Sequence, residues 1–152
     1  MNMSPGEIDS KVVVQRAFWV SQMMESLNDL NLEEKTAFLA DRHKIAAAES
    51  YLRRALEALF DIGRHILAKR FAYPATEYKE IAKGLSDKRV LVEEEAELMR
   101  KMAGYRNRMV HFYHEITPEE LHEICLYHVN EIQFLADKLV QWAKEHQDRA
   151  TN

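Results

Sequence analysis

Hydrophobic residues recur along this chain at alternating spacings of three and four, which is the pattern of amphipathic α-helices. The N-terminal stripe contains Val13, Ala17, Val20, Met24 and Leu27. It follows Ser4-Pro5-Gly6-Glu7, which is typical of a capping box with proline at the first helical position. We therefore expect the first helix to begin at Ser4 and to end at the polar residues 28–31.

A second and longer stripe predicts the longest helix of the protein. Its hydrophobic positions are Ile45, Ala48, Leu52, Leu56, Leu59, Ile62 and Ile66. Asn31 with two following glutamates is a helix start signal, so this helix is expected to run from Asn31 to about Arg70. Residues 72–76 contain Pro74 and interrupt it.

Three further helices complete the expected order of elements. A short helix covers roughly Glu77 to Lys83, and the next begins near Val92 and runs to about Tyr113 with Gly104 as a weak point. Thr117-Pro118-Glu119-Glu120 is a second capping box and starts one last helix, which ends in a polar tail from Glu145 to Asn152. The buried face of that helix is expected to contain Leu121, Ile124, Cys125, His128, Ile132, Leu135, Leu139 and Trp142. The chain is thus predicted to be all-α with about five helices.

Composition narrows the class of protein. A chain of 152 residues with 47% hydrophobic residues, four glycines and three prolines fits one soluble helical domain covering residues 1–152. No apolar run approaches the roughly 20 residues that span a bilayer, and the N-terminus lacks a signal-peptide pattern. We therefore expect a cytoplasmic protein that does not associate with a membrane. Cys125 is expected to be a small buried hydrophobic residue. Because the net charge is −4, any contact with nucleic acid must be local.

One polar helical face carries the candidate chemistry. At about 100° per residue, Arg106, Asn107, His111, Tyr113 and His114 fall on one broad face of the fourth predicted helix. A core-facing stripe would be apolar at these positions. Either a solvent-exposed helix end or a functional site explains the pattern, and periodicity alone does not choose between them.

The same segment resembles the HEPN superfamily, and within it the HepT-like toxins. Their motif is an arginine, a polar residue, three further residues, a histidine, one residue and a tyrosine, which Arg106, Asn107, His111 and Tyr113 match in order and spacing. The resemblance includes residues 102–105, 115–116 and 54–66, and extends from about Arg16 to Trp142. Phe112 departs from it, because many relatives carry an acidic residue there.

The resemblance implies a homodimeric HEPN-type helical bundle that cleaves RNA without a metal or other cofactor, between two copies of the motif. The residue types suit that chemistry. His111, with an ordinary pKa near 6.5, can exchange a proton with the RNA 2′-hydroxyl or the leaving oxygen. Arg106 can bind the phosphate through its planar fork, and Asn107 can orient either partner. Arg100, Lys101 and Arg108 are expected to contact RNA in the dimer cleft.

The resemblance also implies a control device. Relatives of this kind are the toxins of toxin–antitoxin pairs, whose partner is a minimal nucleotidyltransferase that transfers AMP to the motif tyrosine. Here that tyrosine is Tyr113, and an adenylate on it would place a bulky anion beside Arg106. The alternative for Tyr113 is an aromatic residue that packs at a helix end.

Two other functions remain open at this stage. A helical-bundle metalloprotein needs a carboxylate and a histidine three residues apart on paired helices, and only Glu119-x-x-His122 fits that spacing. A HEPN module without catalysis, acting as a binding or nucleotide-sensing partner subunit, is compatible with the same fold. We expect no metal site, and we expect the catalytic function.

Overall fold

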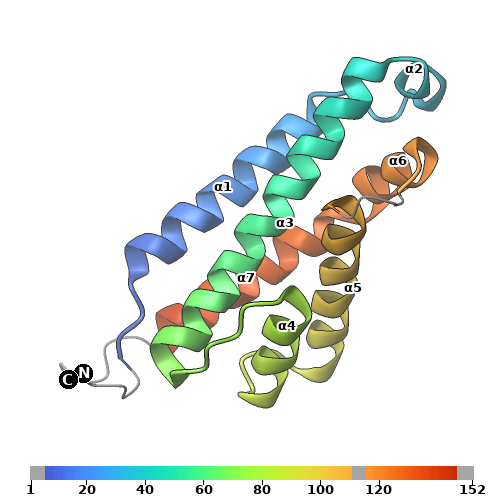
Figure 1. Cartoon of the computed structure of the whole chain (residues 1–152). Helices are drawn as coiled ribbons and strands as arrows, with labels where there is room; N and C mark the ends of the chain where they lie inside the picture. Colours follow the sequence, from blue (N-terminus) through green and yellow to red (C-terminus); the bar gives the residue numbers. More distant parts are fainter. Residues whose placement is uncertain (1–5, 111–115, 147–152) are drawn as a thin grey trace.

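A computed structural model describes residues 6–110 and 116–146, and the elements within these ranges are all α-helices (Figure 1). In chain order they are α1 (Ser10–Asn28), α2 (Lys35–Leu39), α3 (Arg42–Phe71), α4 (Tyr78–Asp87), α5 (Glu93–Val110), α6 (Pro118–Tyr127) and α7 (Val129–His146). The expectation of an all-α fold is confirmed. None of the helices in these two ranges combines the length and the apolar character needed to cross a bilayer.

Three long helices form the body of the bundle. α1 and α3 lie side by side along most of their length, and α7 packs against both (Figure 1). α4 and α5 pair with each other and pack against the C-terminal half of α3. The predicted stripes face the interior: Val13, Val20 and Leu27 are buried, and α3 from Ala48 to Ile66 supplies the centre of one hydrophobic core. This arrangement places one face of α3 against the core and leaves the other exposed between α1 and α5.

The first helix begins later than predicted. Residues 6–9 are not helical, and the cap of α1 is Asp9, whose carboxylate accepts a hydrogen bond from the Lys11 amide at 3.0 Å. The Gly6 amide instead donates to the carbonyl of Lys69 at the end of α3. The segment before α1 is thus tied to α3, and a tertiary hydrogen bond overrides the local capping-box signal.

The second predicted helix is divided in two. Asn31 has a left-handed backbone with φ of 61°, and α2 ends at Leu39. Asp41 then caps a new helix, because its carboxylate accepts from the amides of His43 and Lys44 at 3.0 and 3.2 Å. The prediction that one helix starts at Asn31 is therefore wrong, although the end predicted near Arg70 agrees with the observed end at Phe71.

The helix predicted from Glu77 to Lys83 corresponds to α4, which is longer than predicted because Gly84 does not end it. Glu77 and Glu80 form a capping box at its start, and the helix continues to Asp87. Gly84 is buried, and a Cβ at this position would lie 2.9 Å from Leu67 and from the Tyr73 ring. This glycine is required by the close approach of α4 to the end of α3, not by a turn.

The last predicted helix is broken at His128, which separates α6 from α7. The His128 ring lies 3.3 Å from the Lys101 ammonium group, and its Nδ1 lies 3.4 Å from the Glu131 carboxylate. With α2 and this break, the expected five helices become seven in the described ranges. Six of the eight residues predicted for the buried face are buried, whereas His128 and Trp142 are only half-buried. Cys125 is buried as predicted, which raises its pKa to about 12.

Candidate active site around Arg106

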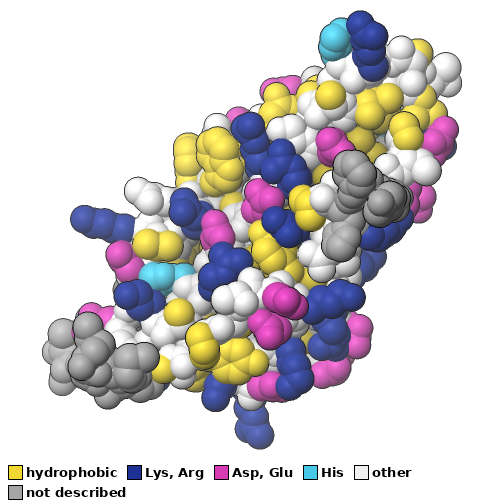
Figure 2. All heavy atoms as spheres, viewed as in Figure 1, with side chains coloured by type: hydrophobic (Ala, Val, Ile, Leu, Met, Phe, Trp, Pro, Cys, Tyr) yellow, Lys and Arg dark blue, Asp and Glu magenta, His cyan; other side chains and the backbone are white. Residues whose placement is uncertain are grey.

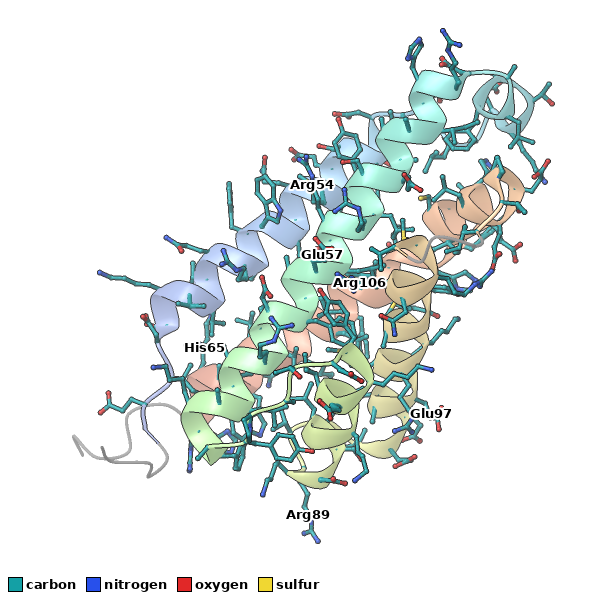
Figure 3. The ribbon with its side chains drawn as sticks, viewed as in Figure 1. Arg54, Glu57, His65, Arg89, Glu97 and Arg106 are labelled. Atoms are coloured by element: carbon teal, nitrogen blue, oxygen red, sulfur yellow. The ribbon has the colours of Figure 1, made fainter. Side chains whose placement is uncertain are left out.

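Arg106 lies on α5 and points toward α3 and α4. Its Nη2 lies 3.3 Å from Oε2 of Glu57 on α3, and its guanidinium group lies 4.3 Å from the centre of the Tyr78 ring on α4 (Figure 3). Only a quarter of the Arg106 side chain is exposed. Three helices therefore fix the orientation of this planar group before any substrate is present.

Tyr78 provides a rigid surface for Arg106. Its ring stacks on the buried Phe60 with a centroid distance of 4.6 Å. Burial raises the pKa of the Tyr78 phenol, and the nearby Arg106 charge opposes that shift only in part. The phenol is thus neutral at physiological pH, and the Tyr78 face attracts the Arg106 cation through its π electrons.

One donor of Arg106 lacks an acceptor within the described part of the chain. The Nε atom is buried and has no hydrogen-bond partner among residues 6–110 and 116–146. A buried donor without a partner costs about 1–3 kcal/mol, so such a group is rarely left unpaired. This property distinguishes Arg106 from an ordinary surface arginine.

Further arginines extend this site along the exposed face of α3. Arg53 pairs with Glu57 at 3.5 Å, and Asp61 pairs with both Arg16 of α1 and Arg64 of α3, at 3.1 and 2.8 Å. Figure 2 shows basic and acidic side chains gathered in the middle of this face, over α3. The result is a local basic surface on a protein whose net charge is negative.

The other predicted RNA-binding residues point elsewhere. Lys101 lies 3.4 Å from Glu131 of α7, and Arg108 forms a two-pronged ion pair with Glu120 of α6, at 2.6 and 2.8 Å. Arg100 pairs with Glu93 and Glu97 on its own helix. Lys101 and Arg108 are thus paired with α7 and α6, and Arg100 with its own helix, so none of the three shares a partner with Arg106.

The remaining motif residues are only partly described. Asn107 is half-buried next to Arg106, whereas His111 and Tyr113 lie outside the described residues, as does Phe112. Sequence analysis missed Glu57 and Tyr78, the two groups that hold Arg106. A signal existed for Glu57, because Arg53, Glu57 and Asp61 recur at intervals of four and form a charged stripe on the long helix. Nothing in the sequence connects Tyr78 with Arg106.

His122, the histidine of the Glu119-x-x-His122 spacing, has a structural role. His122 is buried, its Nε2 donates to the Leu32 carbonyl at 2.6 Å, and its ring packs 5.3 Å from that of Phe38. Both contacts connect α6 with α2 and the segment before it. Within residues 6–110 and 116–146, no three His, Cys, Asp or Glu side chains are grouped to hold a metal ion.

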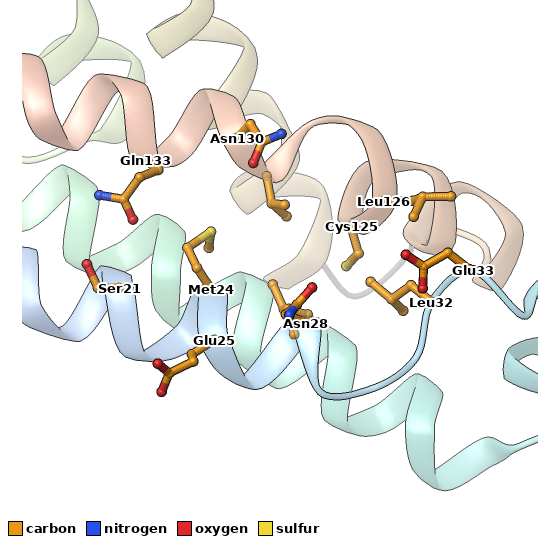
Figure 4. Close-up of a pocket in the computed structure, with 12 residues that line it drawn as sticks. Ser21, Met24, Glu25, Asn28, Leu32, Glu33, Cys125, Leu126, Asn130 and Gln133 are labelled. Atoms are coloured by element: carbon orange, nitrogen blue, oxygen red, sulfur yellow. The ribbon is translucent and has the colours of Figure 1, made fainter.

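A separate pocket lies away from Arg106. It has a volume of about 450 Å³ and is bordered by α1, the segment after it, α6 and the start of α7, with Met24 and Cys125 at its wall (Figure 4). Neither Arg106 nor Asn107 lines it. The site around Arg106 is by contrast an open, charged surface.

Comparisons with known proteins identify the family and the fold. Residues 20–145 match the family model for "Ribonuclease HepT-like" proteins, whereas no curated protein matches the chain. The fold is similar to that of the tri-AMPylated HEPN toxin of Shewanella oneidensis, solved in complex with MNT antitoxin, with a TM-score of 0.75, 17% identity, and coverage of 84% of this chain and 95% of that one. A toxin–antitoxin complex with AMP-PNP gives a TM-score of 0.75 at 16% identity, with coverage of 84% and 97%.

Proposed function

This chain belongs to the HepT-like ribonuclease family, and we propose that it is the toxin of a toxin–antitoxin pair, a metal-independent endoribonuclease. Its cognate antitoxin would be a minimal nucleotidyltransferase. The solved proteins of similar fold are toxins in complex with MNT or MntA antitoxins, which supports the choice of partner.

The observation that carries this proposal is the position of Arg106. Glu57 and Tyr78 hold the guanidinium plane in place, so its donors are oriented before RNA binds. Preoriented donors stabilise negative charge that develops on a phosphate in the transition state, because they need not reorganise during the reaction. The arginine of the family motif is therefore held in place by its neighbours before RNA binds.

His111 supplies the proton transfer in the proposed reaction. One His111 accepts the proton of the 2′-hydroxyl as the 2′-oxygen attacks the phosphorus atom, and the bond to the 5′-oxygen breaks. His111 of a second copy gives a proton to that departing oxygen. The products are a 2′,3′-cyclic phosphate and a free 5′-hydroxyl, and Asn107 orients the imidazole or the phosphate. We propose a homodimer for this reason, and light scattering at micromolar concentration tests it directly.

The experiment that tests the function compares RNA cleavage by the parent protein and by His111→Ala, each with tRNA and mRNA in EDTA. His43→Ala is the matched control, because His43 is exposed at the start of α3. The proposal requires cleavage by the parent and by His43→Ala and none by His111→Ala. Cleavage that stops in EDTA indicates a metalloenzyme, and RNA that stays intact with the parent indicates a non-catalytic HEPN module.

A further inference from the structure

A small cavity lies between α1 and α3, next to the candidate active site. It has a volume of about 150 Å³ and is lined by Arg16, Trp19, Arg54, Glu57, Ala58 and Asp61. Trp19 is 41% exposed, so part of its indole surface is accessible. The cavity therefore combines an accessible indole face with two arginines.

The lining itself holds two arginines and two carboxylates, and further arginines around it make the surrounding surface positive. The two carboxylates, those of Glu57 and Asp61, are surrounded by five arginines, at positions 16, 53, 54, 64 and 106. Each of these arginines except Arg54 forms an ion pair with one of the two carboxylates. Arg54 differs from the others. It is exposed and makes no ion pair with any residue in the ranges 6–110 and 116–146. Its charge is thus available to an anion that enters the cavity.

Glu57 connects this cavity with Arg106. The same side chain forms part of the cavity wall and pairs with the Arg106 guanidinium group. Arg54 precedes Glu57 by three residues on α3, which corresponds to about 4.5 Å along the helix axis. Figure 3 shows Arg54, Glu57 and Arg106 in succession on the face of the molecule seen there. If a phosphate of a nucleic acid strand binds at Arg106, the neighbouring nucleotide of that strand lies at the cavity.

We infer that the cavity between α1 and α3 is a subsite for the nucleotide next to the scissile phosphate of a single-stranded RNA. The Trp19 indole stacks on the base, and Arg54 binds the neighbouring phosphate. Proteins bind single-stranded nucleic acids with this combination of an aromatic platform and a cation, and stacking contributes about 1–3 kcal/mol per base without selecting its sequence. The inference rests on the proposed function, because RNA is the substrate proposed there.

The local charge favours a polyanion over a second copy of the chain as the occupant. A second copy of the chain carries the same excess of positive charge, so it cannot neutralise the arginines around this cavity. A phosphodiester strand neutralises that excess and releases counterions. The net negative charge of the whole chain does not oppose this, because the arginines that outnumber their carboxylate partners lie together along α3 and its neighbours.

Fluorescence of Trp19 measures occupancy of the subsite without any cleavage. The chain has only two tryptophans, so Trp142→Phe leaves Trp19 as the single reporter. The probe is a short 2′-O-methyl oligoribonucleotide, which lacks the attacking hydroxyl and stays intact. We expect saturable quenching of Trp19, a Kd about tenfold weaker in Arg54→Gln, and a slope of log Kd against log salt smaller by about 0.7. Arg89→Gln is the matched control, since Arg89 is exposed at the far end of α4 and should leave both quantities unchanged.

The outcomes separate this inference from the proposed function. Quenching that responds to Arg54→Gln supports the subsite even if the parent protein cleaves no RNA. RNA cleavage without quenching of Trp19, or with an Arg54→Gln affinity equal to that of Arg89→Gln, overturns the subsite and leaves the ribonuclease intact. A shift from dimer to monomer in Trp19→Leu, a variant with unchanged circular dichroism, overturns it in favour of an interface between copies.

Discussion

Arg106 of α5 and Glu57 of α3 are 49 residues apart in the chain, and their charged groups meet at 3.3 Å. This ion pair is only partly exposed, and the Tyr78 ring closes the other side of the guanidinium group. A carboxylate that orients Arg106 also competes with a phosphate for it. Glu57 should therefore influence catalysis and RNA binding in opposite directions.

Glu57→Gln separates these two effects, because glutamine keeps the shape of the side chain and an acceptor oxygen but removes the charge. We expect kcat to fall about tenfold, which corresponds to about 1.4 kcal/mol of lost transition-state stabilisation through a less well oriented Arg106. KM for RNA should stay level or fall, because a negative charge beside the phosphate has been removed. Steady-state cleavage of a labelled oligoribonucleotide measures both constants, and a parental kcat or a raised KM contradicts the positioning role.

Two glycines should respond to alanine in opposite ways. Gly84 is buried against the rigid Tyr73 ring, and a Cβ there would lie 2.9 Å from it. Gly104 of α5 has no atom of the described residues within 4 Å of an added Cβ. Overpacking costs about 1–3 kcal/mol, and replacing glycine by alanine in a helix gains about 1 kcal/mol. Gly84→Ala should therefore lower the free energy of unfolding by about 1 kcal/mol, and Gly104→Ala should raise it by about 0.5–1 kcal/mol.

Urea denaturation followed by circular dichroism measures both values. Each variant is the control for the other, since the change in composition is identical. Equal shifts in the same direction would mean that the close approach of α4 to α3 is not what requires Gly84.

His65 should make the stability of the N-terminal connection depend on pH. Its Nε2 accepts a hydrogen bond from the Asp9 amide at 2.9 Å, which requires a neutral imidazole. Burial lowers the pKa of His65, the Lys69 charge lowers it further, and Asp9 opposes both. The unfolded chain then binds a proton more readily than the folded protein. The stabilisation that this hydrogen bond gives is fully present at pH values above about 6.5, the ordinary pKa of histidine. It is lost as the pH falls toward the lower pKa that His65 has in the folded protein.

The control is His65→Gln, whose amide oxygen can accept the same hydrogen bond and does not titrate. We expect the parent to lose more stability than this variant between about pH 8 and about pH 5.5, measured by urea denaturation at each pH. Hydrogen exchange of the Asp9 amide should accelerate, relative to its intrinsic rate, at the lower pH in the parent alone. Parallel losses in both proteins would assign the pH dependence to other groups.

Periodicity located the hydrophobic faces correctly, because burial of a helix face depends on spacing within the helix itself. Val20, Leu52 and Leu139 are all fully buried, as their stripes predict. Helix ends were less predictable, because tertiary contacts decide them. The Gly6 amide bonds to Lys69 instead of starting a helix, and Gly84 packs against α3 instead of ending one.

The candidate site could likewise be predicted only in part. The motif placed Arg106 on a polar face, but its partners Glu57 and Tyr78 come from helices whose packing no local pattern encodes. Charge alone suggested Arg100, Lys101 and Arg108 as RNA contacts. The carboxylate partners of Lys101 and Arg108, on α7 and α6, could not be identified before the helices were placed, whereas those of Arg100 lie on its own helix.

Covalent control at Tyr113 is tested by co-expression with the cognate nucleotidyltransferase and Mg-ATP. We expect the peptide containing Tyr113 to gain mass in steps of one adenylate and the modified protein to lose RNA cleavage. The added anionic phosphate would repel RNA from Arg106. Tyr113→Phe should remain unmodified and active, and Tyr105→Phe is the matched control on α5. A silenced protein with an unmodified Tyr113 would leave only inhibition by binding.

In the proposed mechanism, Arg106 and His111 cleave RNA through its own 2′-hydroxyl, without a metal. The most direct measurement compares an oligoribonucleotide with the same strand carrying 2′-deoxyribose throughout, both incubated with the protein in EDTA. We predict that the ribose strand is cut to a 2′,3′-cyclic phosphate and a 5′-hydroxyl, and that the deoxyribose strand stays intact. Cleavage of the deoxyribose strand, or cleavage of either strand only after Mg²⁺ is restored, would contradict the account.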